Sequence, residues 1–316
     1  VKLVFQPAEE GGAGGLAMIH DGLLEARPRI SRLFALHVWP GLPAGTIASR
    51  TGTLMAAAGF FHAAFIGHGG HAAMPQTTTD PFMCVAPALQ SLQTIVSRNL
   101  APIEAGVVSV TFIRGGEAYN VIPERVELGG TIRSLSREGY RFLEDRVSEV
   151  MRAAAALGGC TVNLTLSSFE ADCFNQPAPP GAPGSCTFPP TVNAGSAWRV
   201  ARAAASALVG ADAVVDSEPT MGGEDFAYLL EKRPGAMVFL GIGNNTLGTT
   251  VNLHNPKFQM DESQLHLGAA LHVEMATRSL TEIAAVDSKL GCNDDSELGG
   301  EIGPQCGMGT HLETED

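Results

Sequence analysis

Several short apolar runs in this sequence end in glutamate or histidine, and this pattern constrains the fold more than any other feature. The first run covers residues 1–5 and is followed closely by Glu9 and Glu10. The second covers residues 33–40 and carries His37 near its end. Both runs have the composition of buried strands. Because ligands bind at the carboxyl ends of strands in open α/β sheets, we expect an α/β protein with a polar site at one sheet edge.

Length and charge narrow the classes of protein to which the chain could belong. Its 316 residues are enough for two domains. The net charge of -13 argues against a nucleic-acid partner. No apolar run approaches the roughly 20 residues that cross a bilayer. The chain starts with Val1, inside the first predicted strand, so we expect an N-terminally truncated or processed form.

The six cysteines do not form a C-x-x-C pair, so a structural zinc site is not indicated. Cys173 and Cys186 lie in a proline-rich stretch, residues 173–190, which we expect to be a loop or a disordered insertion. These two cysteines could pair in a disulfide, and a reduced intracellular chain is an equally open interpretation.

The middle of the chain has a different organisation. Its hydrophobic pattern predicts four strands and two helices in the order β-α-β-β-α-β, which is the order of a ferredoxin-like unit. The predicted strands are residues 60–67, 107–113, 126–133 and 161–166, and the predicted helices are residues 80–98 and 137–157. This unit looks like a compact domain inserted into the first one.

The last third of the chain returns to the first domain. Expected helices cover residues 198–208, 227–232 and 261–280, and an expected strand covers residues 236–242. Glu224 and Asp225 precede the second of these helices, where acidic residues are ordinary helix-dipole chemistry. His254 lies in a loop after the strand. Residues 284–316 are acidic and glycine-rich and are predicted to form a tail.

Four of these polar residues suit a metal centre. Glu9, Glu10, His37 and His254 all follow or end predicted strands. Histidine and carboxylate ligands are typical of zinc or manganese sites. Two adjacent carboxylates also suit a division of labour, in which one binds a cation and the other moves a proton.

Seven short motifs together resemble the M20 family of metallopeptidases, closest to its amidohydrolase branch. They occur in the family's order from residue 1 to about residue 280. The motifs are Gln6-Pro7-Ala8-Glu9-Glu10-Gly11, Leu36-His37-Val38-Trp39-Pro40, the turn from Gly67 to Pro75 with His71, Asn120-Val121-Ile122-Pro123, Gly130-Thr131-Ile132-Arg133, Gly223-Glu224-Asp225-Phe226 and Leu253-His254-Asn255-Pro256. The branch includes hippurate hydrolases, N-acyl-amino-acid amidohydrolases and plant auxin–amino acid conjugate hydrolases.

The resemblance implies an α/β fold: a zinc-peptidase-like catalytic domain, incomplete at its N-terminus, with an inserted α+β ferredoxin-like lid and dimerisation domain. The catalytic domain would comprise residues 1–58 and 170–283, the inserted domain residues 59–169, and a disordered tail residues 284–316. The family's Cys-Gly-His-Asp segment, which supplies two further metal ligands, is absent, so only part of its two-metal site is expected here. Gly59 stands where relatives tend to have aspartate.

The resemblance also implies roles for single residues. Glu9 would be the general base, and Glu10, His37 and His254 would be metal ligands. His71 would reach the substrate's carbonyl oxygen, in this family often across a dimer interface. The substrate-binding residues would be Asn120, Arg133, Gly222 and Gly223.

The implied function is metal-dependent hydrolysis of the amide bond of N-acyl amino acids, with two manganese or zinc ions in the complete site. The substrates would be auxin conjugates or hippurate-like compounds, and the enzyme would be a homodimer. Two alternatives stay open: an inactive fragment that retains the fold, and a dipeptidase or carboxypeptidase of the same superfamily. The compartment is unknown, and the resemblance is compatible with the cytoplasm or the ER lumen.

Overall fold

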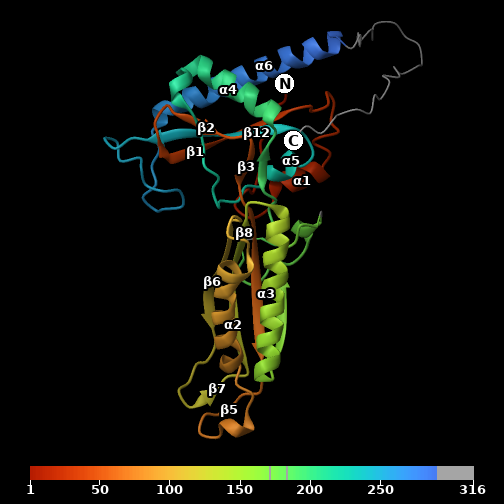
Figure 1. Cartoon of the computed structure of the whole chain (residues 1–316), viewed down its shortest axis with the longest axis vertical. Helices are drawn as coiled ribbons and strands as arrows, with labels where there is room; N and C mark the ends of the chain where they lie inside the picture. The colour runs from red at the N-terminus through yellow and green to blue at the C-terminus, as the bar shows by residue number, and fades with distance from the viewer. Residues whose placement is uncertain (171, 183, 290–316) are drawn as a thin grey trace, which may run out of the picture.

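The computed structural model describes residues 1–170, 172–182 and 184–289, and these form a mixed α/β protein with two separate four-stranded sheets and two short two-stranded ones. The four-stranded sheets occupy opposite ends of an elongated molecule (Figure 1). Within the described residues, no helix is long and apolar enough to cross a membrane.

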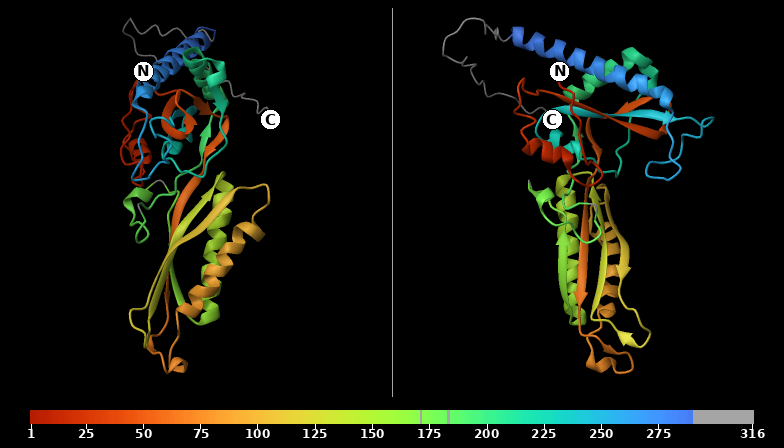
Figure 2. Two further views of the ribbon diagram at one scale, coloured as in Figure 1. Left: turned by 90° about the vertical axis from the view of Figure 1, so that its left-hand side faces the viewer. Right: turned by 180° about the vertical axis from the view of Figure 1, so that it is seen from behind.

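The first sheet has the strand order β1-β12-β2-β11, in which β1 (Leu33–Pro43) and β12 (Gly235–Gly243) are parallel. The remaining strands are β2 (Ile47–Ser49), antiparallel to β12, and β11 (Val214–Asp216), parallel to β2. Helices cover both faces (Figure 2). Because successive side chains of a strand point to opposite faces, the apolar run of β12 is buried on both sides.

The helices of this half are joined to the sheet by two apolar clusters. On one face, Val238 and Leu240 pack with residues of α4 (Gly195–Val209) and α6 (Leu265–Lys289). On the other, Met237 and Phe239 pack with residues of α5 (Phe226–Leu230). α1 (Gly14–His20) packs against α5, which brings the N-terminal part of the chain beside residues more than 200 positions later.

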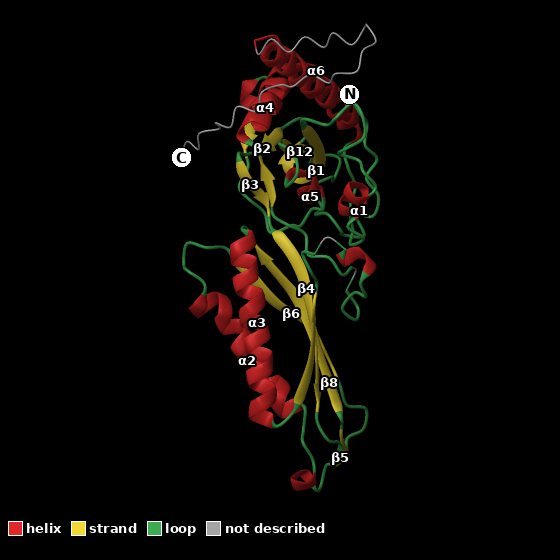
Figure 3. Ribbon diagram, turned by 90° about the vertical axis from the view of Figure 1, so that its right-hand side faces the viewer, coloured by secondary structure: helices red, strands yellow, loops and turns green. Residues whose placement is uncertain are grey.

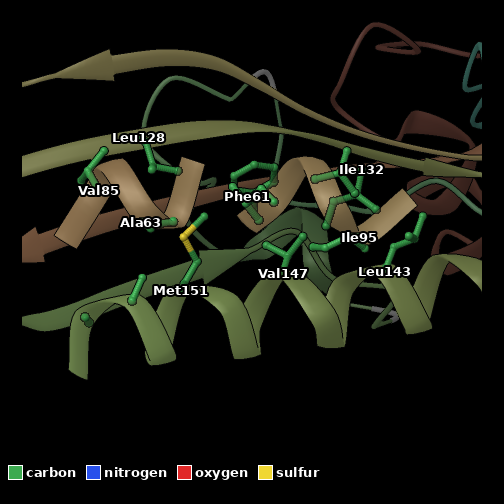
Figure 4. Close-up of a cluster of buried hydrophobic side chains, with 14 of the residues drawn as sticks. Phe61, Ala63, Val85, Ile95, Leu128, Ile132, Leu143, Val147 and Met151 are labelled. Carbon is green, nitrogen blue, oxygen red and sulfur yellow. The ribbon is translucent and has the colours of Figure 1, made fainter. Parts of the chain in front are cut away.

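The second sheet is antiparallel throughout and has the order β6-β8-β4-β9. Its strands are β4 (Ala57–Ile66), β6 (Gly106–Arg114), β8 (Arg125–Ser134) and β9 (Thr161–Leu166). α2 (Phe82–Thr94) and α3 (Arg137–Gly158) cover one face (Figure 3). Leu143, Val147 and Met151, spaced four residues apart on α3, point at the strand side chains (Figure 4). The observed element order is the predicted β-α-β-β-α-β.

Two short pairings complete the described structure. β3 (Gly52–Met55) pairs with β10 (Thr191–Asn193) near the junction between the two sheets. β5 (Gly70–His71) pairs with β7 (Val121–Ile122) at the far tip of the second sheet (Figure 1).

The prediction of a strand over residues 1–5 is wrong. These residues form no β ladder, and Val1, Leu3 and Phe5 are 80%, 82% and 85% exposed. They lie in an open groove beside β1 and α6, with only the alternate side chains half-buried. Apolar and β-branched composition favours an extended backbone, but a strand also needs a hydrogen-bonded neighbour, which the described residues do not provide here.

Two further predictions need correction. The tail was predicted to begin at residue 284, but α6 continues to Lys289. The first predicted tail residues are Ala284 and Ala285, and alanine is a strong helix former, so the helix extends through them. The rest of that tail, residues 290–316, lies outside the described residues. The proline-rich stretch is irregular as expected, but its two ends are packed, because a disulfide joins Cys173 to Cys186 and both are buried, whereas residues 175–178 are exposed. A second disulfide joins Cys84 to Cys160.

Candidate active site

Glu9 and Glu10 lie in a tight turn between the extended first residues and α1. The turn is closed by hydrogen bonds from the backbone N–H of Gly11 to the carbonyl of Glu9 (2.6 Å) and from that of Gly12 to the carbonyl of Ala8 (2.9 Å). A Cβ at Gly14 would lie 1.7 Å from the carbonyl oxygen of Pro7, so only glycine fits there. The glycine-rich sequence is therefore what allows two carboxylates to stand side by side.

Glu10 faces His254 across the mouth of the site. Nδ1 of His254 is 3.9 Å from Oε2 of Glu10, and both side chains are exposed. His254 has a φ of 61°, a left-handed conformation in the loop that follows β12. This sharp turn presents its imidazole toward the carboxylate turn.

His37 is presented from β1 with its ring fixed. Nδ1 lies 2.7 Å from the carbonyl oxygen of Val38, and the ring meets Trp39 edge-on. A carbonyl can only accept, so Nδ1 carries the proton and Nε2 keeps its lone pair. An imidazole held by a backbone carbonyl in this way is typical of a metal ligand. The donor set of Glu10, His37 and His254 thus fits a divalent metal of the zinc or manganese type.

Glu9 is half-buried, and its surroundings act on its pKa in opposite directions. Burial and the adjacent Glu10 carboxylate raise the pKa of Glu9. The imidazoles of His37 and His254 and the backbone N–H of Asp225 lower it. These interactions place all four predicted centre residues in one neighbourhood. A carboxylate with a raised pKa, beside metal-type ligands, suits proton transfer.

Two acidic residues that the sequence analysis assigned to helix-dipole chemistry belong to the same site. Carboxylate oxygens of Glu9, Glu224 and Asp225 lie within 4.8 Å of one another, and no other group of three His, Cys, Asp or Glu residues in the described part of the chain is this tight. Burial, with the charge of Glu9 adding to it, raises the pKa of Glu224 to about 7. Burial also raises the pKa of Asp225 to about 6. Their position after two glycines was the available sequence signal.

Arg133, Gly222 and Gly223 meet at the junction between the two sheets. Nη1 of Arg133 donates to the carbonyl of Met221 at 3.0 Å, and a Cβ at Gly223 would lie 3.6 Å from that nitrogen and 2.6 Å from Cβ of Ala58. Burial lowers the pKa of Arg133. No carboxylate among the described residues forms an ion pair with it. The junction therefore holds a half-buried cation without a charged partner.

His71 and Asn120 lie together at the tip of the second sheet, far from the carboxylate turn (Figure 1). The backbone N–H of Ala72 donates to the carbonyl of Asn120 at 2.9 Å. Nδ1 of His71 accepts from the backbone N–H of Ala73 at 3.1 Å, so Nε2 carries the proton and is exposed as a donor. Within one chain, the structure does not bring these two predicted site residues to the other seven.

Comparison with known proteins gives a consistent result. The model of peptidase family M20/M25/M40 matches residues 1–278. IAA-amino acid hydrolase ILR1-like 4 of Arabidopsis thaliana is 38% identical over 90% of this chain and 61% of its own length. N-acetylcysteine deacetylase of Bacillus subtilis is 33% identical over 90% of this chain and 67% of its own length.

The solved structure of the Bacillus subtilis YXEP protein, described as a dinuclear metal binding peptidase from the M20 family, is similar in fold. It has a TM-score of 0.66 and 28% identity, over 88% of this chain and 64% of that one. This chain spans about three fifths of the length of the curated plant relatives it matches.

Proposed function

The chain belongs to peptidase family M20/M25/M40, as the motifs predicted, and we propose on that premise that it carries the active site of a metal-dependent hydrolase that cleaves the amide bond of N-acyl amino acids. The observation that carries the proposal is the half-buried Glu9 beside the Glu10–His254 pair. The names of the relatives supply the substrate class, because the plant proteins are hydrolases of IAA-amino acids and the bacterial one deacetylates N-acetylcysteine.

Glu10, His37 and His254 would hold divalent metal, manganese or zinc, as the ligands that this chain supplies. When bound, a pair of such ions lowers the pKa of a water toward about 7 and polarises the scissile carbonyl. His37 needs no tautomer change to bind, because its Nδ1–H is already committed to the carbonyl of Val38.

Glu9 would act as the general base and then as the general acid. It would take the proton from the attacking water and pass it to the leaving amine, which must leave neutral. Partial burial supports this role, because it disfavours the ionised carboxylate and so makes Glu9 a better proton acceptor than an exposed glutamate.

Arg133 would receive the carboxylate of the amino acid, because it is a half-buried cation that has no charged partner among residues 1–170, 172–182 and 184–289. Gly222 and Gly223 would line the pocket beside it, where Cβ atoms would narrow the space. The segment from β4 to β9 would serve as lid and dimerisation domain. Its tip would bring Nε2–H of His71 and the amide of Asn120 to the site of a second copy.

The test is to replace Glu9 by glutamine and to measure turnover and metal content together, with manganese or zinc supplied. We expect Glu9→Gln to abolish turnover of N-acyl amino acids and to keep bound metal, while Glu10→Ala loses metal. Retained turnover in Glu9→Gln contradicts the base assignment. A substrate panel separates the alternatives, since preference for free dipeptides over N-acyl amino acids would indicate a dipeptidase.

A further inference from the structure

Asp225 is fully buried and makes three contacts that converge on the turn holding Glu9. One carboxylate oxygen accepts a hydrogen bond from Nε2 of Gln6, and the other accepts from the backbone N–H of Gly15 at 2.8 Å. The backbone N–H of Asp225 also faces the Glu9 carboxylate and lowers its pKa. Gln6 and Gly15 stand on opposite sides of the turn, so one side chain holds both of its ends.

Helix capping does not explain these contacts. Asp225 precedes α5 in the N-cap position, yet its side chain makes no capping hydrogen bond. The backbone N–H of Phe226 is instead bound by Oε1 of Glu224 at 3.1 Å. The carboxylate of Asp225 is thus directed away from its own helix and toward a turn about 210 residues earlier in the chain.

The backbone conformation of this turn needs contacts with other parts of the chain to hold it in place. Ala8 and Ala13 have φ values of 52° and 51°, in the left-handed region that residues other than glycine rarely adopt. Such conformations persist where the surroundings fix them. The approach is also close, since a Cβ at Gly15 would lie 2.8 Å from the carbonyl oxygen of Asp225. The described contacts of Asp225 supply that restraint at both ends of the turn.

We propose that Asp225 is a positioning residue for Glu9. Its carboxylate fixes the two ends of the turn that carries Glu9. The proposal rests on the proposed function, in which Glu9 is the base. Position matters here because a displacement of about 1 Å in a catalytic group lowers the rate by about 10²-fold.

The experiment is kinetic, with N-acetylated amino acids as substrates. Asp225→Ala removes both carboxylate contacts, and we expect kcat to fall by about 10²-fold while KM and metal content stay unchanged. Asp225→Asn keeps an acceptor for the N–H of Gly15 and loses less. In the Glu9→Gln background, which has no turnover, the readout is metal content, and Asp225→Ala leaves it unchanged because the residue acts through Glu9. A purely structural role would lower the metal content in both backgrounds.

Gln6→Ala is the second variant, because Gln6 is half-buried and its loss removes only one contact of Asp225. If Asp225→Ala does not fold, Gln6→Ala still tests the proposal. We expect its kcat to fall by less than that of Asp225→Ala. Full activity in Gln6→Ala and in whichever Asp225 variants fold overturns the positioning role. So does a loss of bound metal when Asp225→Ala is added to Glu9→Gln. Full turnover by Glu9→Gln itself, or none by the wild type, rejects the proposed function first and the positioning role with it.

Discussion

Gly59 has no room for a side chain, although the family resemblance predicts aspartate at this position. A Cβ there would lie 2.1 Å from the hydroxyl of Tyr140, 2.4 Å from that of Ser167 and 2.7 Å from that of Thr187. The hydroxyls of Ser167 and Thr187 are themselves 2.7 Å apart and buried. A hydroxyl cluster thus occupies the volume that an aspartate side chain would need.

Gly59→Ala should lower the free energy of unfolding by about 1–3 kcal/mol, because the added carbon displaces packed hydroxyls. Urea denaturation measures the change. Gly268→Ala is the matched control. Gly268 lies inside α6, and a Cβ there would make an ordinary 3.5 Å contact with Leu240 of β12, so the substitution should raise the free energy of unfolding by about 0.5–1 kcal/mol. If the two substitutions change the free energy of unfolding equally, the hydroxyl cluster rearranges around a new side chain without a cost in stability.

The site could be predicted from the sequence only where each residue carries its own local signal. Glu9, Glu10, His37 and His254 were predicted because each follows or ends an apolar run. Asp225 was assigned to its own helix, since its true partners, Gln6 and Gly15, are more than 200 residues away. A contact over that separation leaves no trace in local spacing.

The same reasoning applies to whole elements. The long strands and helices were predicted closely because their hydrophobic period is visible within the element, as for β9, which covers the predicted residues 161–166. β2, β10 and β11 have three residues each, too few for a period, and are defined by their pairing alone. The prediction for residues 1–5 fails for the opposite reason: their composition is that of a strand, but no strand in the described part of the chain pairs with them.

One prediction at this scale concerns α3. Burial, with Asp145 adding to it, raises the pKa of Glu144 to about 7 from 4.5. The folded state therefore holds this proton more tightly than the unfolded state. The resulting stabilisation is complete below about pH 4.5 and is lost as pH rises through about 7.

Glu144→Gln should remove that part of the pH dependence, so the variant gains stability relative to the wild type as pH rises from 5 to 8. Thermal unfolding across this range measures the gain. Glu149→Gln removes one exposed charge from the same helix and serves as the control. Parallel curves for wild type and Glu144→Gln would contradict the assignment.

The loop closed by Cys173 and Cys186 is expected to support the carboxylate turn. A Cβ at Gly184, inside this loop, would lie 1.8 Å from the carbonyl oxygen of Gly11, so the two backbones are in close contact. The side chains of Cys173 and Cys186 pack with Ala13 and Leu16. The backbone and the disulfide of the loop thus lie against the C-terminal part of the turn and the start of α1.

Replacing Cys173 and Cys186 together by serine should lower the free energy of unfolding by about 3 kcal/mol, the effect of opening a loop of this size. Hydrogen exchange of residues 11–15 should also become faster. The Cys84→Ser, Cys160→Ser pair is the control, because that disulfide lies in the second sheet's core. It should reduce stability without a selective effect on residues 11–15. If both pairs affect the turn equally, the loop does not support it specifically.

The shape of the whole molecule separates two sets of predicted site residues. α1, which directly follows the carboxylate turn, lies in the half of the molecule with the first sheet, whereas β5, which contains His71, lies at the far tip of the other half (Figure 1). His71 is exposed and already presents Nε2–H as a donor. A group that is ready to bind an oxyanion but far from its own metal-type ligands suits a symmetric dimer, in which each tip reaches the other copy's site.

Complementation tests this arrangement. Glu9→Gln and His71→Ala chains should each be inactive or nearly so, while their equimolar co-expression should restore about a quarter of wild-type activity. The fraction follows because half of the dimers are mixed and each mixed dimer has one site with both residues intact. Co-expression of Glu9→Gln with the Glu9→Gln, His71→Ala double variant is the control, since no site then has an intact Glu9. Restored activity in the first mixture alone supports the shared site, whereas none in either would mean that each chain completes its own site after a rearrangement that brings the tip to the turn.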